Sequence, residues 1–265
     1  MGVSVSAPAR MRVLGPDDPA PAVVLNPGGR SPFLLIGDHA GSAIPASLGG
    51  LGLRATDRQR HIAIDIGVRE LGDRLSSELD ATFIRQPYSR LVVDCNRDPF
   101  SSEAIPEVSD GTPIPGNERL AEEARHARIE DILLPYHARI AEAIAARGTD
   151  RRATILVSLH SFTPVLGTIP RPWHVGLLYM AGRSDFATAL LEQLTQRPGL
   201  VVGDNQPYRM DATDYSVPRH AFLSGLRYAE LEVRQDLIAD DGGQRRWAEW
   251  LAEDMTAALG TLPPL

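Results

Sequence analysis

The chain has 265 residues, of which 43% are hydrophobic and 23% are charged, and its formal net charge is −7. This acidic balance argues against nucleic-acid binding, which normally needs a basic surface, and favours a soluble enzyme. The single cysteine, Cys95, excludes an intrachain disulfide and a cysteine-rich zinc site. The sequence contains no signal-peptide pattern and no apolar run long enough to span a bilayer, so we expect no membrane association and a cytoplasmic location.

The N-terminal segment, residues 1–30, is rich in Ala, Pro and Gly and is predicted to form an arm or an edge extension. Residues 31–265 are predicted to form one domain, since no linker or repeat divides them. Within this domain apolar runs alternate with helical patterns, which indicates an α/β sheet buried on both faces. Strands are expected within residues 32–41, 81–86, 90–96, 153–160, 174–180, 199–205 and 226–233, and helices over residues 57–79, 118–147, 184–195 and 242–259. Pro135 should kink or divide the second of these helices. The polar segment 98–117 is predicted to be a long loop of the kind that often binds or covers a ligand.

Two of the predicted strands end in histidine. His39 follows the apolar run FLLIG, and His160 ends the run TILVSL. The carboxyl ends of buried strands form the edge at which open α/β sheets assemble their sites. Either histidine alone would most simply pack a turn, but the two together can place both imidazoles on one ion, and zinc prefers His and carboxylate ligands where thiols are absent.

A catalytic zinc needs a third protein ligand, and the predicted helix over residues 57–79 offers two candidates. His61 and Asp65 are four residues apart and would share one helical face. Asp65 lies in the apolar run IAIDIGV, where an unpaired carboxylate would be costly. His61 lies nearer the polar start of the helix and could equally be a solvated surface residue.

Tyr88–Asp98 carries a second group of polar residues, in which a predicted strand runs into Asp94, Asn96 and Arg97. Arginine matches a carboxylate well because its planar fork donates two parallel hydrogen bonds. The functional interpretation is a site for a negatively charged substrate group. The structural alternative is that Asp94 and Arg97 pair with each other.

Glu230 and Glu232 lie two residues apart in a predicted strand and therefore point to the same face. A glutamate beside an activated water can act as general base. The alternative is an edge strand with a charged outer face. The remaining histidines, at positions 126, 137, 174 and 220, are interpreted as surface or packing residues, or as residues that support others, without a direct role.

The sequence resembles the N-formylglutamate amidohydrolase family. The resemblance is carried by five blocks in order: Asp38-His39-Ala40-Gly41-Ser42 with Pro45, Ile64-Asp65-Ile66-Gly67, Tyr88-Ser89-Arg90 running into Val93-Asp94-Cys95-Asn96-Arg97, Leu159-His160-Ser161, and Glu230-Leu231-Glu232-Val233-Arg234-Gln235-Asp236. It implies a mixed, mostly parallel sheet between helices, as in zinc carboxypeptidases and aspartoacylases, with one zinc ion at its edge.

The same resemblance implies roles for individual residues. His39, Asp65 and His160 would be the metal ligands, and Asn96 with Arg97 would hold a substrate carboxylate. Arg90 would polarise the scissile carbonyl, and Glu232 would be the catalytic glutamate, with Glu230 as second choice. One block departs from the family, because Ala63-Ile64-Asp65 stands where other members carry Trp-His-Val-Asp.

The predicted function is therefore zinc-dependent hydrolysis of the amide bond of N-formyl-L-glutamate or another N-acyl amino acid, with a small carboxylated substrate as the expected partner. Two alternatives remain open. The same machinery could cleave a small peptide, or a metal-free protein of this fold could bind a carboxylate through Arg90, Asn96 and Arg97. A serine hydrolase is disfavoured, because the sequence contains no G-x-S-x-G motif.

Overall fold

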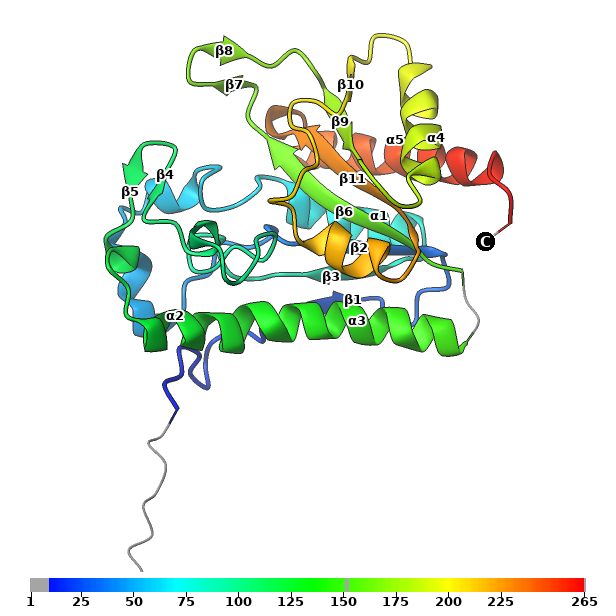
Figure 1. Ribbon diagram of the computed structural model, residues 1–265. Helices are drawn as coiled ribbons and strands as arrows, with labels where there is room; N and C mark the ends of the chain where they lie inside the picture. The colour runs from blue at the N-terminus through cyan, green and yellow to red at the C-terminus, as the bar shows by residue number, and fades with distance from the viewer. Residues whose placement is uncertain (1–9, 151–152, 265) are drawn as a thin grey trace, which may run out of the picture.

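A mixed sheet forms the centre of the computed structural model shown in Figure 1, which describes residues 10–150 and 153–264. Its strands are β1 (Val23–Leu25), β2 (Phe33–Gly37), β3 (Thr82–Arg85), β6 (Ile155–Phe162), β9 (Val175–Leu178), β10 (Val202–Asp204) and β11 (Arg227–Arg234). Their order across the sheet is β1-β3-β2-β6-β11-β9-β10. Two small hairpins lie outside it, β4 (Val108–Ser109) with β5 (Thr112–Pro113) and β7 (Val165–Leu166) with β8 (Ile169–Pro170).

Four neighbouring strands at the centre of the sheet, β3, β2, β6 and β11, run parallel. At one side β1 pairs antiparallel with β3, and at the other β9 pairs antiparallel with β11 and parallel with β10. The carboxyl ends of the central strands therefore meet at one edge, where polar side chains from separate parts of the chain can converge.

Helices cover both faces of the sheet, and Figure 1 shows α3 along one side with α4 and α5 on the other. One face packs against α1 (Val68–Glu78), α4 (Asp185–Thr195) and α5 (Asp241–Gly260). The opposite face packs against α2 (Glu122–Arg128), a π-helical turn (Ile129–Leu133) and α3 (Leu134–Thr149). These layers confirm the predicted single-domain α/β fold with a mostly parallel sheet.

The strands contribute alternate side chains to the two layers, as their two-residue period requires. In β6, Val157 packs in the cluster with α1, α4 and α5, whereas Leu156 packs in the cluster with α3. Further along the α3 face the strands turn polar. Glu230 pairs in register with Ser158, and Glu232 with His160. The prediction that the two glutamates share a face is confirmed, and this polar stretch marks where the site begins.

Two predicted elements are wrong. The helix expected over residues 57–79 begins only at Val68, since residues 57–59 form a 3-10 turn and the chain then continues in turns to Gly67. Gly67 has φ 83°, and a Cβ at this position would lie 2.2 Å from the Ile238 carbonyl oxygen. A regular helix therefore cannot pass through it, and His61 and Asp65 do not share a helical face.

The strand expected over residues 90–96 is also wrong, because this segment forms turns. Its apolar residues Val92 and Val93 are buried in the α3-side cluster, and the Asp94 amide donates to the Ala104 carbonyl. Packing between loops explains the apolar run as well as a sheet would. The helix expected over residues 118–147 is divided near Pro135, as predicted, by the π-helical turn just before it, because proline lacks the amide hydrogen needed to continue a regular ladder.

The segment 98–117 contains the β4–β5 hairpin and short helical turns, and hydrogen bonds of Asn117 anchor its C-terminal end. The Asn117 side chain donates to the carbonyls of Leu91 and Pro106, and Arg128 donates to the Asn117 side-chain oxygen at 2.6 Å. The remaining short helical elements are Ala46–Gly52, Asp57–Gln59, Ser102–Ala104, Pro115–Asn117, Pro218–Phe222 and Gln235–Leu237.

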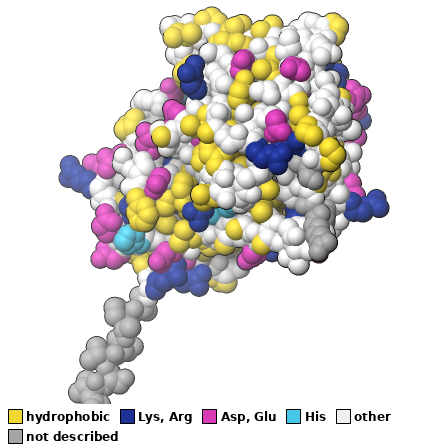
Figure 2. Space-filling view, turned by 45° about the vertical axis from the view of Figure 1, so that its right-hand side comes forward, with side chains coloured by type: hydrophobic (Ala, Val, Ile, Leu, Met, Phe, Trp, Pro, Cys, Tyr) yellow, Lys and Arg dark blue, Asp and Glu magenta, His cyan; other side chains and the backbone are white. Residues whose placement is uncertain are grey.

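The predicted arm contributes β1 to the sheet edge, while residues 1–9 lie outside the described part of the chain. None of the described helices is both long and apolar enough to cross a membrane. On the face in Figure 2, acidic and basic side chains are scattered among each other and are not gathered by sign.

Candidate metal centre and active-site cavity

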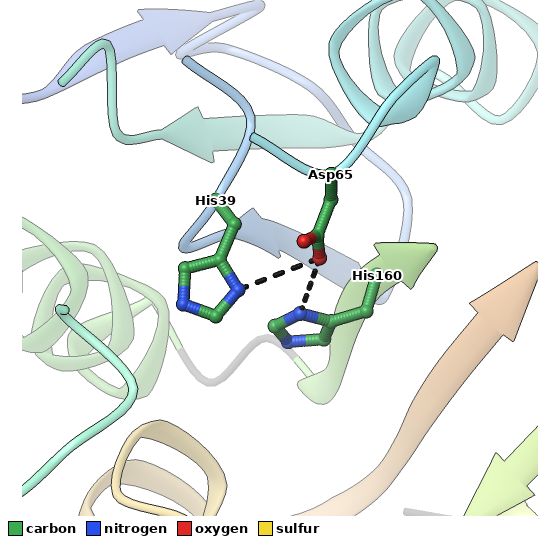
Figure 3. A group of neighbouring side chains, drawn as sticks. All are labelled: His39, Asp65 and His160. Atoms are coloured by element: carbon green, nitrogen blue, oxygen red, sulfur yellow. Dashed lines mark hydrogen bonds and ion pairs between the residues drawn. The ribbon is translucent and has the colours of Figure 1, made fainter. Parts of the chain in front are cut away.

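His39, Asp65 and His160 converge at the carboxyl edge of the sheet (Figure 3). All three side chains are buried, and their ligand-type atoms lie within 4.8 Å of one another. The Asp65 Oδ2 atom lies 3.4 Å from His39 Nδ1 and 3.0 Å from His160 Nδ1. Two imidazoles and a carboxylate at this spacing match the ligand set of a catalytic zinc ion.

The local backbone explains why Asp65 reaches this position without a helix. Its amide donates to the His39 carbonyl at 3.0 Å, which ties the turn carrying Asp65 to the loop that follows β2. His160 comes from β6, the strand beside β2. The structure places Asp65 between the two histidines, whereas His61 lies beside Asp110, with its Nε2 atom 3.4 Å from that carboxylate.

Both histidines turn Nδ1 toward Asp65 and hold Nε2 against an outer partner. His39 Nε2 lies 2.7 Å from Asp94 Oδ1. His160 Nε2 lies 3.0 Å from Ser158 Oγ and 3.6 Å from Asp38 Oδ2. Outer partners of this kind fix the orientation and tautomer of metal-binding histidines. His39 Nδ1 is buried without a hydrogen-bond partner among the described residues, so it is free to bind a cation.

The charges of the cluster depend strongly on one another. Burial lowers the pKa of His160, but its hydrogen bonds to Asp38 and Asp65 outweigh burial and raise that pKa well above the ordinary value. Burial raises the pKa of Asp65, but His39 and His160 outweigh it and lower the pKa far below the usual range. Asp65 is therefore ionised, and it lies between two imidazoles whose pKa values are raised. A divalent cation could take the place of the protons that these imidazoles would otherwise bind.

Arg90 joins the cluster from the turn before Asp94. Its Nε and Nη2 atoms donate to Asp94 Oδ2 at 3.0 and 2.7 Å, and its Nη1 atom lies 3.5 Å from Asp65 Oδ1. Burial opposes its charge, but the carboxylates of Asp94 and Asp65 raise the pKa of the guanidinium further. Arg90 therefore compensates the charge of the carboxylate that holds His39.

Glu230 and Glu232 face the same space from β11, and each has a buried Oε2 atom without a hydrogen-bond partner among the described residues. Burial raises the pKa of Glu230 to about 8 and that of Glu232 to about 7, although His160 lowers both. The alternative of a charged edge strand is wrong, because β11 lies inside the sheet between β6 and β9.

A cavity of about 390 Å³ opens above the cluster. Its walls include every residue predicted for the site, namely His39, Asp65, Arg90, Asn96, Arg97, His160, Glu230 and Glu232. They also include Ser161, which belongs to one of the family blocks, and His61, the alternative ligand candidate. The remaining wall residues were indicated by no sequence pattern, namely Phe162, Thr163, Leu178, Tyr208, Arg209, Asp211, Thr213 and Asp214. A space of this size can hold an N-acyl amino acid.

Asn96 and Arg97 line the cavity but already have internal partners. The Asn96 side chain donates to Asp214 and accepts from the amides of Tyr215 and Ser216. Arg97 donates to the Asn96 carbonyl at 2.9 Å, and its nearest carboxylate is that of Glu103, 3.4 Å from Nε. The proposed pairing of Asp94 with Arg97 is not found among the described ion pairs, since Asp94 pairs with Arg90 and His39.

A second histidine pair lies beneath the site. His137 is buried, with Nδ1 2.9 Å from His220 Nε2 and Nε2 2.8 Å from the Cys95 carbonyl. Neither this pair nor Asp38, whose Oδ1 atom accepts from Tyr136, was given a place in the site from the sequence. Asp38 stands beside His39 in the first family block, but this position does not reveal that Asp38 faces His160 instead.

Comparison with known proteins identifies one matching family and several similar structures. The family model described as N-formylglutamate amidohydrolase matches residues 31–239. A gene product from Agrobacterium tumefaciens of known structure is 36% identical, with a TM-score of 0.91 over 94% of this chain and 99% of that one. The N-formylglutamate amidohydrolase from Ralstonia eutropha is 20% identical, with a TM-score of 0.65 over 91% of this chain and 98% of that one. A search of curated proteins found no match.

Proposed function

The chain belongs to the N-formylglutamate amidohydrolase family, and we propose that it uses one zinc ion to hydrolyse the amide bond of an N-acyl amino acid such as N-formyl-L-glutamate. The observation that carries this proposal is the convergence of His39, Asp65 and His160 at the base of a cavity that also holds two buried glutamates. Family membership supports the reaction class, amide hydrolysis. The metal and the substrate are the parts that we propose.

The residues fit a divalent cation on their own chemistry. The partnerless Nδ1 atom of His39 faces Asp65, and the outer nitrogens of both rings are held by other residues. We propose that His39, Asp65 and His160 hold the ion. When bound, zinc supplies a Lewis acid and lowers the pKa of water toward neutrality.

Glu232 is the proposed general base. Its pKa of about 7 lets it accept a proton from the attacking water near neutral pH and pass that proton to the leaving amine. Glu230 lies two residues earlier on the same face, and its pKa of about 8 keeps it mostly protonated under the same conditions. Glu232 also lies in register with His160, which places it next to the proposed metal ligands.

The arginines and Asn96 orient the substrate in this proposal. Arg90 places positive charge beside Asp65, and from there it would stabilise the negative charge that develops on the carbonyl oxygen. Arg97 and Asn96 lie on the cavity wall, where they would together hold a substrate carboxylate. Holding the carboxylate fixes the amide relative to Glu232 and so converts binding energy into orientation.

The test is release of formate from N-formyl-L-glutamate by purified protein, measured as prepared, after chelation and after zinc is restored. We expect activity that disappears with the chelator and returns with zinc. Activity that survives complete metal removal would refute the metal proposal. Bound zinc without formate release would refute the substrate, and a panel of other N-acyl amino acids and small peptides would then identify the class that is cleaved.

A further inference from the structure

This inference builds on the proposed function and concerns the arginines of the cavity. The chain has no lysine, so its guanidinium groups are its only permanently cationic side chains. Three of them line the cavity: Arg90, Arg97 and Arg209. Arg90 is committed to Asp94, and Arg97 donates to the Asn96 carbonyl and lies near Glu103 and Asp214. Two of the three arginines are therefore already compensated within the protein.

Arg209 differs from these two. Its side chain is exposed at the cavity wall, and it makes no hydrogen bond and no ion pair with any residue in the described ranges. A guanidinium group presents five donors in a planar fork and has no acceptor. Its free donors suit an anionic planar group that enters the cavity from outside.

Tyr208, the preceding residue, adds a second donor to the same wall. Arg171 donates from Nη1 to the Tyr208 hydroxyl oxygen at 2.9 Å. Since arginine can only donate, the hydroxyl oxygen accepts there and its own proton is free for another partner. Desolvation and the Glu232 carboxylate raise the pKa of Tyr208 above its ordinary value, so the hydroxyl keeps that proton.

Arg171 makes this wall more cationic. It is 6% exposed, lies 4.7 Å from the Tyr208 ring centroid, and has no carboxylate partner among the described residues. Its other side-chain donation is to Thr163 Oγ1. A buried cation without a carboxylate partner, in contact with Tyr208, favours the binding of a negatively charged group close to the Tyr208 hydroxyl.

The loop that carries these donors is closely packed. The Asn205 amide donates to the Leu177 carbonyl, and the Asn205 side chain accepts from the Tyr179 amide. A Cβ at Gly176 would lie 1.8 Å from the Gln206 carbonyl oxygen, so the loop lies directly on β9. The backbone just before Tyr208 and Arg209 is therefore held against a strand of the sheet, which reduces the cost of ordering this loop on binding.

We propose that Tyr208 and Arg209 form a carboxylate-binding subsite for the substrate, separate from the Asn96–Arg97 pair. The carboxylate could come from either end of a dicarboxylic amino acid, since the α-carboxylate and the side-chain carboxylate share this chemistry. A cavity with two separate carboxylate-binding groups would select acidic N-acyl amino acids over neutral ones.

The test compares binding of three ligands: N-formyl-L-glutamate, N-formyl-L-glutamine, which has a neutral side chain, and N-formyl-L-isoglutamine, which has a neutral α-position. Dissociation constants are measured by isothermal titration calorimetry in the Glu232→Gln background, so that turnover does not consume the ligand. Arg209→Met is expected to weaken binding of N-formyl-L-glutamate by about 10- to 100-fold, as loss of a hydrogen bond between charged groups does. Tyr208→Phe is expected to weaken it by a smaller factor.

The pattern across ligands identifies the carboxylate. A loss for the glutamate and isoglutamine derivatives, but not for the glutamine derivative, assigns the side-chain carboxylate. A loss for the glutamate and glutamine derivatives alone assigns the α-carboxylate. Equal losses for all three, no loss for any, or no binding of any ligand before Arg209 is changed would overturn the subsite.

Two controls distinguish loss of the subsite from a general effect of removing an arginine and from failure of the proposed reaction. Arg246→Met removes an exposed arginine on α5, on the opposite face of the sheet, and should leave all three dissociation constants unchanged. Formate release by wild-type protein is measured in parallel. If it is absent while the ligand pattern holds, the proposed reaction fails and the subsite stands. If it is present while the pattern is flat, the subsite fails and the reaction stands.

Discussion

At the scale of single residues, each histidine proposed as a metal ligand is oriented by a second residue that contacts the ring nitrogen facing away from Asp65. His39 faces Asp65 through one nitrogen and Asp94 through the other, and His160 divides its nitrogens between Asp65 and the pair Ser158 and Asp38. These contacts also shift the pKa of the outer partner Asp38. Burial raises that pKa, but the interaction with His160 outweighs burial and lowers it to about 2. Replacing one of these outer partners should therefore change zinc affinity, because the histidine that it orients is a proposed ligand.

Asp94→Asn tests this at His39. Asparagine keeps the size of the side chain but loses the charge that orients the imidazole and anchors Arg90, so we expect zinc affinity to fall about 10- to 100-fold. Competition with a chromogenic chelator measures the affinity. Asp110→Asn is the matched control, because Asp110 is a partly exposed carboxylate beside His61 that contacts none of the proposed ligands. Equal zinc affinities in wild type and Asp94→Asn would contradict an outer-partner role.

The two glutamates should differ in their kinetic effects. Glu232→Gln is expected to lower kcat/KM by about 10²- to 10⁴-fold, the usual contribution of a general base, with zinc content unchanged. Glu230→Gln should cause a smaller decrease, because the higher pKa of Glu230 leaves little of it ionised near neutral pH. Formate release and metal analysis on both variants provide the measurement. The assignment is reversed if Glu230→Gln causes the larger loss.

At the scale of elements, the site depends on two loops that pack against each other beyond the strand ends. The loop after β2 carries His39, and the loop after β3 carries Pro87 and Arg90. The Ala43 amide donates to the Pro87 carbonyl at 3.0 Å, and the Ser89 amide donates to the Ala43 carbonyl at 2.9 Å. This explains Gly41 in the first motif, since a Cβ there would lie 2.0 Å from the Pro87 carbonyl oxygen.

Gly41→Ala should therefore separate these loops. The new methyl group meets backbone atoms that cannot rotate away, and overpacking of this kind costs about 1–3 kcal/mol in the free energy of unfolding. Urea denaturation measures the loss, and zinc affinity should fall with it because His39 moves. Gly28→Ala is the control, since a Cβ at Gly28 has no neighbour within 4 Å. Two variants of equal stability would show that the loops can shift without cost.

At the scale of the whole molecule, stability should depend on the buried pair His137 and His220, which joins α3 to the turn before β11. The Cys95 carbonyl can only accept, so His137 donates to it from Nε2. With both rings neutral, His137 Nδ1 carries no proton and accepts from His220 Nε2. Burial lowers the pKa of His137 to about 4 and that of His220 to about 3.

The sign of the pH effect follows from these values. Below pH 6.5 the unfolded chain binds protons that the folded pair refuses, so folding stability falls as the pH decreases from 6.5 toward 4. The loss is about 1.4 kcal/mol per pH unit for each neutral histidine. His220→Gln keeps a donor but cannot titrate, so its stability should fall less steeply than that of wild type in urea denaturation at several pH values. His126→Gln, at an exposed position on α2, is the control. Parallel slopes for wild type and His220→Gln would contradict the neutral pair.

The sequence by itself determined the α/β layers, the strand ends that carry His39 and His160, and the shared face of Glu230 and Glu232. These follow from local periodicity, because a two-residue repeat and a strand end fix direction without knowledge of distant contacts. The residue pattern also offered Asp65 and the Asn96–Arg97 pair as candidates, and the resemblance selected Asp65 over His61. The helix predicted around Asp65 and the strand predicted before Asp94 were wrong, because burial within loops produces the same apolar pattern as burial in regular elements.

Only the tertiary structure decided which atoms face each other. It placed Asp94 behind His39, Asp38 behind His160, and His137 against His220, across separations of 55, 122 and 83 residues. It also showed that Arg90 and Arg97 have internal partners, while Arg209 has none among the residues that the structure describes. Hydrogen bonding and charge compensation depend on angstrom-scale distances between segments far apart in the chain, and no local pattern encodes those distances.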